Sequence, residues 1–220
     1  MRTVVFDLDG TLADTSGDLL AAANACFRGL GHGDMLDSAD TLTAFHGGRA
    51  MLHLGFSRLS GYSEADVDAQ YSVLLAAYSG AIDRHTTLYP GVVAAITALR
   101  DAGYGLAICT NKPEGLAETL TRRLGIRHLF GALVGADTLP VRKPNPAPLF
   151  EAIDRVGGDA RRAVLIGDTQ TDRDTGRAAN VPVVLVSFGP EGAGVARMEP
   201  DAVLDHFDDL ADLVQRMLAG

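Results

Sequence analysis

Short runs of apolar residues recur along the chain, and segments with helical periodicity separate most of them. The runs are rich in β-branched residues and do not alternate with polar positions, which is typical of strands buried on both faces of a parallel sheet. They lie at residues 3–6, 106–109, 132–134, 163–166, 183–186 and 202–204. Several of the helical segments are followed by glycines, where helices commonly end. This alternation predicts an α/β fold with a doubly wound parallel sheet.

One long stretch, residues 15–84, breaks the alternation of strand and helix. Its apolar residues recur at helical spacing, and one of its helices is expected to start at Ser63 or Glu64. About 70 residues without a strand are more than a single crossover between two strands requires. We therefore expect an inserted α-helical cap domain at 15–84 and a Rossmann-like core at 1–14 and 85–220.

The net charge of the chain argues against two classes of binding partner, namely nucleic acids and anionic membranes. The 28 acidic residues outnumber the 19 basic ones in this chain of 220, giving a formal net charge of −9. A broad surface for nucleic acid or for an anionic membrane is therefore not expected. An anionic ligand would need a local positive site on this otherwise negatively charged chain.

The start of the chain and its cysteines indicate where the protein works. Met1 and Arg2 lead directly into the first predicted strand, so a signal peptide is not expected. No apolar run approaches the ~20 residues of a membrane span. The two cysteines show no metal-binding spacing and suit a reducing compartment. A cytoplasmic location is expected.

Only two of the 19 basic residues are lysines, Lys112 and Lys143. A chain that otherwise uses arginine keeps lysine either by chance or where a compact ammonium is needed. Both lysines lie in loops that follow predicted strands, and Lys143 is flanked by a proline-rich segment, 144–148, that stiffens its loop. Their positions favour a role in binding an anion.

Two carboxylates directly follow the first predicted strand. Asp7 and Asp9 come after Phe6 and are followed by Gly10 and Thr11. Charged groups at the end of a buried strand are costly unless they bind a cation or accept hydrogen bonds. Because ligands bind at the carboxyl ends of such strands, the pair indicates a site for Mg²⁺. The alternative is an Asp-rich turn without a function, which would show the same sequence.

Two further groups follow other strands of the same predicted sheet. Thr110, Asn111 and Lys112 come after the second strand, where Thr110 or Asn111 could also cap the next helix. Asp168 follows the fourth strand, and Asp172 follows four residues later, where it could also simply open a helix. Asp168 beside Asp7 and Asp9 would add repulsion unless a cation lay between them.

Taken together, the pattern D-x-D-G-T, a threonine at a strand end, a loop lysine and G-D-x-x-x-D resembles the haloacid dehalogenase superfamily, most of whose members are phosphatases. The resemblance covers nearly the whole chain. Residues 110–113, 135–140 and 142–149 look like the phosphoglycolate phosphatase subfamily.

The resemblance implies a role for each of these residues. Asp7 would be the nucleophile that forms an aspartyl-phosphate, and Asp9 the general acid and base. Mg²⁺ would be held by Asp7, the backbone carbonyl of Asp9 and Asp168, with Asp172 as a ligand or as a support. Thr110 and Lys143 would contact the phosphoryl oxygens.

The expected cap would select the leaving group. Gly47 and Gly48 lie where a helix is expected to start, and Gly48 and Arg49 could receive a substrate carboxylate, or they could merely join two helices. Asn111 and Lys112 are further candidates for substrate contact. The segment after Asp172 departs from the family pattern at Arg173, Gly176 and Asn180: Asn180 is expected to end the helix in the left-handed conformation, Gly176 to weaken it, and Arg173 has no evident role.

The implied activity is Mg²⁺-dependent hydrolysis of a small phosphomonoester, with 2-phosphoglycolate first among the substrates. The expected partner is therefore a small phosphorylated metabolite, and the chain is expected to be a monomer or a homodimer. The alternatives are hydrolysis of another small phosphate ester or of pyrophosphate, and a phosphomutase similar to β-phosphoglucomutase. A dehalogenase is disfavoured because it has no use for Asp9. A receiver domain is disfavoured by the long helical insertion, and a silent binding protein by the complete set of Asp7, Asp9, Lys143 and Asp168.

Overall fold

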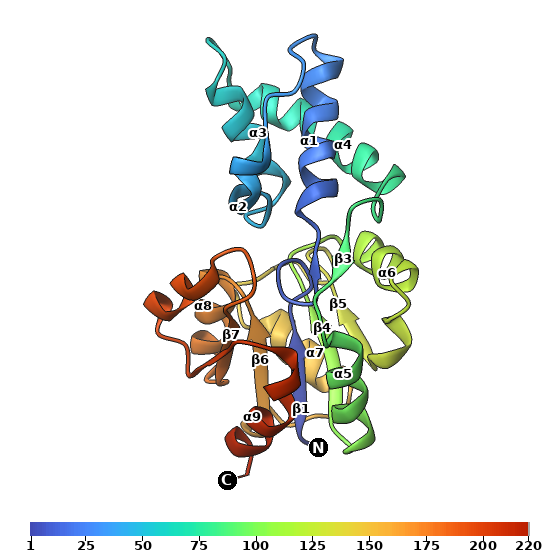
Figure 1. Cartoon of the computed structure of the whole chain (residues 1–220), viewed down its shortest axis with the longest axis vertical. Coiled ribbons are helices and arrows are strands. Elements are labelled where there is room, and N and C mark those ends of the chain that lie inside the picture. The colour runs from blue at the N-terminus through green and yellow to red at the C-terminus, as the bar shows by residue number, and fades with distance from the viewer. Residues whose placement is uncertain (220) are drawn as a thin grey trace. The chain divides into compact units, whose positions relative to one another are not determined.

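The computed structural model describes residues 1–219, and its centre is a six-stranded parallel sheet (Figure 1). The strand order is β5-β4-β1-β6-β7-β8, with neighbouring strands paired in parallel. The strands are β1 (Thr3–Phe6), β4 (Gly105–Cys109), β5 (Ala132–Val134), β6 (Ala163–Gly167), β7 (Val183–Val186) and β8 (Ala202–Leu204). Every predicted strand is present, and two are extended by a glycine. The predicted α/β fold is confirmed.

Helices cover both faces of this sheet. They are α5 (Val92–Asp101), α6 (Glu114–Arg123), α7 (Ala147–Arg155), α8 (Gln170–Ala179) and α9 (Leu210–Met217), with 3-10 turns at Arg127–Leu129, Ala160–Arg162, Gly192–Met198 and Phe207–Asp209. In Figure 1, α5 and α9 lie in front of the sheet and α7 lies behind it.

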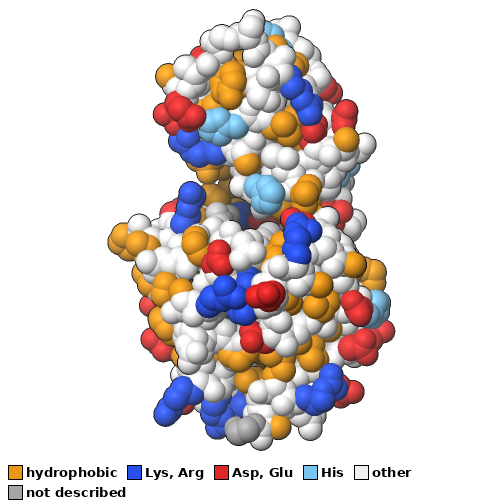
Figure 2. Space-filling view, turned by 90° about the vertical axis from the view of Figure 1, so that its left-hand side faces the viewer, with side chains coloured by type: hydrophobic (Ala, Val, Ile, Leu, Met, Phe, Trp, Pro, Cys, Tyr) orange, Lys and Arg blue, Asp and Glu red, His pale blue; other side chains and the backbone are white. Residues whose placement is uncertain are grey.

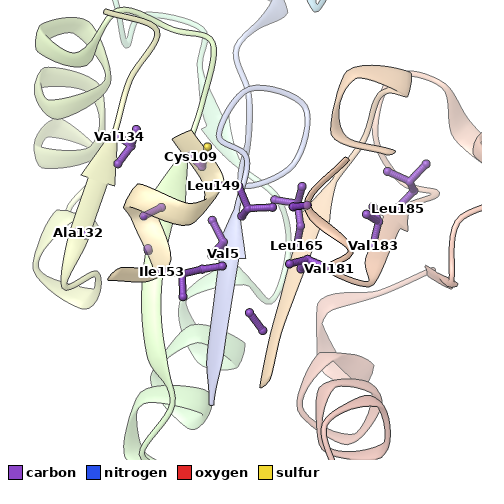
Figure 3. Packing of buried hydrophobic residues seen from close by; sticks show 14 of the residues in the cluster. Val5, Cys109, Ala132, Val134, Leu149, Ile153, Leu165, Val181, Val183 and Leu185 are labelled. Atoms are coloured by element: carbon purple, nitrogen blue, oxygen red, sulfur yellow. The ribbon is translucent and has the colours of Figure 1, made fainter. Parts of the chain in front are cut away.

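The strands and α7 share a hydrophobic core. Val5 and Leu165 from the central strands are completely buried, as is Leu149 on α7, and Ile153 packs in the same cluster (Figure 3). Each such side chain stabilises the fold by about 1.5–3 kcal/mol. This core holds the strand ends in fixed positions, so that side chains placed there are preorganised.

Residues 14–87 form a second, helical unit, and residues 1–13 and 88–220 form the first. The second unit contains α1 (Ser16–Gly29), α2 (Thr41–Ala44), α3 (Gly48–Ser57) and α4 (Glu64–Gly80), with a 3-10 turn at Ser38–Asp40. The expected helix start at Ser63 is confirmed, because Ser63 and Asp66 form a capping box. The helical segment expected at 15–84 lies inside this unit.

The chain passes between the two units at a pair of very short strands. β2 (Ala13–Asp14) pairs with β3 (Thr87–Leu88) in a separate two-stranded sheet. Strands of two residues carry no periodicity, so the sequence could not have predicted them.

A buried carboxylate ties together the two ends of the helical unit. Asp18, in the first turn of α1, is 3% exposed. It accepts hydrogen bonds from the backbone N–H of His85 at 3.0 Å and of Thr86 at 2.9 Å, and from Thr86 Oγ1 at 2.8 Å. The start of α1 is therefore bound to the segment that precedes β3.

The structure explains two unusual residues of α8 and a third that directly follows it. Asn180 ends the helix with φ 53°, as predicted. Arg173 donates from Nε to the carbonyl of Glu199 at 2.7 Å and lies 3.5 Å from Asp201 Oδ2. The cost of Gly176 in helix propensity stays a prediction, and the structure adds a packing reason for this glycine: a Cβ there would lie 2.0 Å from Val183 Cγ2. Glycine lets α8 pack closely on β7.

Candidate active site

The ends of three adjacent strands bring the predicted catalytic residues to one edge of the sheet. β1 lies between β4 and β6, and Phe6 is in register with Ile108 and Ile166. The N–H of Asp7 still donates to Ile166 O at 2.9 Å, one residue beyond β1. Asp7, Thr110 and Asp168 therefore follow neighbouring strand ends, as the sequence pattern predicts.

Three carboxylates converge at this edge. Oxygen atoms of Asp7, Asp168 and Asp172 all lie within 4.8 Å of one another. Lys143 reaches into the group, with Nζ 2.7 Å from Asp172 Oδ1 and 3.1 Å from Asp7 Oδ1. Asp168 and Asp172 are completely buried and Lys143 is 3% exposed, so these charges interact with little screening by water.

The surroundings shift the pKa values of this group. Burial raises the pKa of Asp7 to about 6, although Lys143 opposes the shift. Burial, together with Asp172 and Asp7, raises the pKa of Asp168. Burial lowers the pKa of Lys143, but Asp172 and Asp7 outweigh it, so the pKa of Lys143 is raised. Lys143 therefore stays an ammonium, and the carboxylates lack a full balance of positive charge.

The donor set at this edge suits a hard cation such as Mg²⁺. Asp168 Oδ1 accepts a hydrogen bond from Thr11 at 2.9 Å, but Asp168 Oδ2 is buried without a hydrogen-bond partner among residues 1–219. A buried carboxylate oxygen without a partner is costly, and a cation would remove that cost. Three carboxyl groups beside one lysine can carry more negative than positive charge, so a cation would also improve the charge balance. The residues therefore fit the metal that the sequence predicts.

Asp172 has partners for both of its oxygens. Oδ1 accepts from Lys143, and Oδ2 accepts from Thr169 Oγ1 at 2.7 Å and from the N–H of Thr169 at 3.1 Å. A Cβ at position 167 would lie 2.4 Å from Asp172 Cγ, so Gly167 makes room for this carboxylate. Of the two roles predicted for Asp172, these contacts favour support of the site.

Asp9 is not one of the three converging carboxylates, and it pairs with the other lysine. Lys112 Nζ is 2.8 Å from Asp9 Oδ1 and 3.0 Å from Asp9 Oδ2. Lys112 is 7% exposed, so this is a largely buried ion pair. The sequence motif suggested that Lys112 contacts the substrate. No pattern in the sequence indicated a contact with Asp9, which lies 103 positions earlier.

Thr110 and Asn111 organise the loops around the lysines. Thr110 Oγ1 accepts from the N–H of Lys112 at 3.1 Å, and Asn111 Nδ2 donates to the carbonyl of Lys143 at 3.0 Å. The alternative that Thr110 or Asn111 caps the following helix is wrong, because Pro113 is the N-cap of α6. Asn111 instead connects the two lysine-bearing loops, which no sequence motif had indicated.

Gly48 and Arg49 belong to the helical unit, where Arg49 already has partners. Gly48 is the first residue of α3, after Gly47 with φ 95°. Arg49 lies 2.6 Å from Asp68 Oδ1, and its guanidinium carbon lies 5.0 Å from the ring centre of Tyr71. The helix start is thus as expected, while the binding of a substrate carboxylate by Gly48 and Arg49 stays a prediction.

Figure 2 shows one face of the molecule, on which acidic and basic side chains are interspersed. Among the helices of residues 1–219, none combines the length and the apolar character that crossing a bilayer requires.

Comparison with known proteins agrees with this geometry. Residues 4–186 match the family model described as haloacid dehalogenase-like hydrolase. A phosphoglycolate phosphatase of Mesorhizobium japonicum is 41% identical over 217 residues, covering 98% of this chain and 96% of that protein. One from Agrobacterium fabrum is 35% identical, covering 92% and 88%. A crystal structure of a predicted phosphoglycolate phosphatase from Haemophilus somnus has a TM-score of 0.85 and 25% identity, covering 98% of both chains.

The chain belongs to the haloacid dehalogenase-like hydrolases. Within that family it is similar to proteins named phosphoglycolate phosphatase. The predicted family and the predicted enzyme class, a phosphatase-like hydrolase, are confirmed.

Proposed function

We propose that the protein is a Mg²⁺-dependent phosphatase for a small phosphomonoester, with 2-phosphoglycolate as the first candidate substrate. The observation that carries this proposal is the group formed by Asp7, Asp168, Asp172 and Lys143 at the carboxyl ends of β1 and β6. The names of the relatives support the choice of substrate.

In the proposed reaction, Asp7 forms a covalent intermediate. A carboxylate oxygen of Asp7 attacks phosphorus, the bond from phosphorus to the ester oxygen breaks, and Asp9 gives its proton to the departing alkoxide. Water then attacks the aspartyl-phosphate and passes a proton back to Asp9. Inorganic phosphate leaves, and both aspartates return to their initial forms. The net change is one ester and one water converted into one alcohol and one phosphate.

The other residues hold the reacting groups in place. Lys143 stays charged and is positioned by Asp172, so it is suited to bind phosphoryl oxygens beside Asp7. Thr110 is the second residue proposed for that contact. Asp7, Asp168 and the backbone carbonyl of Asp9 would hold Mg²⁺, with Asp172 in support. When bound, the cation lowers the repulsion between the carboxylate nucleophile and the phosphate dianion.

A phosphate-release assay tests the proposal. Wild-type protein should release phosphate from 2-phosphoglycolate faster than from sugar phosphates, nucleotides or pyrophosphate, and a chelator should stop the release. Asp7→Asn should lose the activity, because an amide is a poor nucleophile. Asp34→Asn is the matched control, since Asp34 is an exposed surface acid.

The outcomes separate the parts of this proposal. Release that survives chelation or the Asp7→Asn exchange would contradict the mechanism. Slow hydrolysis of 2-phosphoglycolate beside fast hydrolysis of another ester would contradict only the substrate. Return of the phosphate to a sugar instead of to water would identify the alternative, a phosphomutase.

A further inference from the structure

The ion pair between Lys112 and Asp9 has no role in the reaction described so far. It links the loop after β1 to the loop after β4. Asp9 is the proposed general acid and base, so the ion pair places a lysine directly beside it. Resting on the proposed function, we propose that Lys112 is a positioning residue that fixes the orientation of the Asp9 carboxyl group. This differs from the direct substrate contact that the sequence suggested for Lys112.

The geometry of the pair restricts the Asp9 side chain. Lys112 Nζ is 2.8 and 3.0 Å from the two oxygens of Asp9, so the ammonium lies between them. The Asp9 side chain is 17% exposed and that of Lys112 is 4% exposed. An ion pair that water reaches so little loses little strength to screening. The contact with both oxygens therefore restricts rotation of the Asp9 carboxyl group.

The backbone around Lys112 is fixed as well. The N–H of Lys112 donates to Thr110 Oγ1 at 3.1 Å, and its carbonyl accepts from the N–H of Ala136 at 2.9 Å. A lysine side chain that starts from a held backbone loses less conformational freedom when its ammonium is bound. Thr110 and Lys112 thus form one local unit beside Asp9.

Hydrogen-bond chemistry then determines where the Asp9 proton lies. A lysine ammonium has three donors and no acceptor, whereas a neutral carboxyl has one O–H donor and one oxygen that only accepts. The contact with both oxygens fits the carboxylate form of Asp9. When Asp9 carries its proton, the ammonium keeps its contact with the oxygen that only accepts, and the O–H must point away from Lys112. Lys112 thereby orients the O–H that delivers the proton to the leaving group. In the second step, the same contact holds the carboxylate that takes a proton from water.

The proposal predicts that the effect of removing Lys112 depends on the leaving group. Protonation matters most when the leaving alkoxide is strongly basic, and it matters little for a stable anion such as p-nitrophenolate. The kcat/KM value reports the first transfer to Asp7 and is the quantity to compare. The substrates are 2-phosphoglycolate, ethyl phosphate, which has a basic leaving group and no carboxylate, and p-nitrophenyl phosphate.

We expect Lys112→Met to lower kcat/KM by about tenfold to 100-fold for both alkyl phosphates, because misplacing a catalytic group by about 1 Å has an effect of this size. For p-nitrophenyl phosphate the loss should be less than about threefold, as the proton contributes little there. In an Asp9→Asn background, Lys112→Met should change kcat/KM no further, since it acts through Asp9. Arg100→Met, which removes an exposed charge on α5, should leave all three substrates unchanged.

Other outcomes would overturn this role. A loss confined to 2-phosphoglycolate would show that Lys112 binds the substrate carboxylate. An equal loss on all three substrates, no loss on any, or a further loss in the Asp9→Asn background would also contradict it. If Lys112→Met does not fold, Lys112→Arg replaces it, because arginine keeps the charge but not the compact ammonium. Lys112→Arg should likewise lower kcat/KM more for the alkyl phosphates than for p-nitrophenyl phosphate. Absence of turnover by wild-type protein on every substrate would instead contradict the proposed function.

Discussion

At the scale of single residues, Oδ2 of Asp168, which has no hydrogen-bond partner within residues 1–219, leads to a testable prediction. The buried carboxylates of Asp7, Asp168 and Asp172 repel one another, and Lys143 offsets only part of that charge. Replacing Asp168 by Asn keeps an oxygen for Thr11 to donate to but removes one negative charge. The metal-free variant should therefore be at least as stable as the wild type, while its affinity for Mg²⁺ should fall.

Urea unfolding with and without Mg²⁺ measures both effects. At a Mg²⁺ concentration 100 times its dissociation constant, the wild type should gain about 2.7 kcal/mol in free energy of unfolding. Asp168→Asn should lose most of this gain, whereas the surface control Asp34→Asn should keep it. A full Mg²⁺ gain in Asp168→Asn would mean that the cation binds elsewhere.

Residues at strand ends could be predicted from the sequence, whereas their detailed pairing could not. Asp7, Thr110 and Asp168 each follow an apolar run, and parallel strands bring such positions to the same edge. The pairing of Lys112 with Asp9, and of Lys143 with both Asp7 and Asp172, depends on loop paths and on side-chain torsions. Neither has a periodic signal in the sequence.

At the scale of elements, Gly176 shows how packing overrides helix propensity. In an open helix, alanine in place of glycine gains about 0.5–1 kcal/mol. At position 176, however, the new Cβ would lie 2.0 Å from Val183 Cγ2 and 2.8 Å from the carbonyl oxygen of Val181. Overpacking of this kind typically costs about 1–3 kcal/mol. Gly176→Ala should therefore lower the free energy of unfolding by about 1–2 kcal/mol.

Gly115 in α6 provides the matched comparison, because no atom of the described residues, 1–219, lies within 4 Å of a Cβ built there. Gly115→Ala should raise the free energy of unfolding by up to about 1 kcal/mol. The two values come from the same urea titration. If both exchanges stabilise the protein, α8 moves away from β7 at little cost, and the close approach does not explain Gly176.

Elements were predictable to the extent that they carry a pattern. The apolar runs gave the strands of the large sheet, and the capping residue Ser63 gave the start of α4. The pair β2 and β3 was missed because two residues show no alternation. The same limit applied to Gly176, whose neighbours Val181 and Val183 come together only through the turn after α8.

At the scale of the whole molecule, the two units separate two groups of interactions. One unit contains the side chains proposed for metal binding, and the other contains Asp18 with its hydrogen-bond donors. Asp7, Asp168 and Asp172 lie in the unit of residues 1–13 and 88–220, while Asp18, His85 and Thr86 lie in the unit of residues 14–87. Asp18→Ala would remove the acceptor for the N–H of His85 and for the buried N–H of Thr86, and a buried donor left without a partner costs about 1–3 kcal/mol. This loss should fall on the helical unit alone.

Hydrogen exchange of the full-length chain measures this division. In Asp18→Ala, amides of His85, Thr86 and α1 should exchange faster, because local opening of residues 14–87 becomes cheaper. Amides of β1, β4 and β6 should keep their wild-type rates, and the stabilisation by Mg²⁺ should be unchanged. Asp34→Ala is the control within the same unit, since an exposed ion pair contributes at most about 1 kcal/mol. Equal acceleration in the strands of the large sheet would show instead that the two units open as one cooperative body, and metal binding would then depend on Asp18 as well.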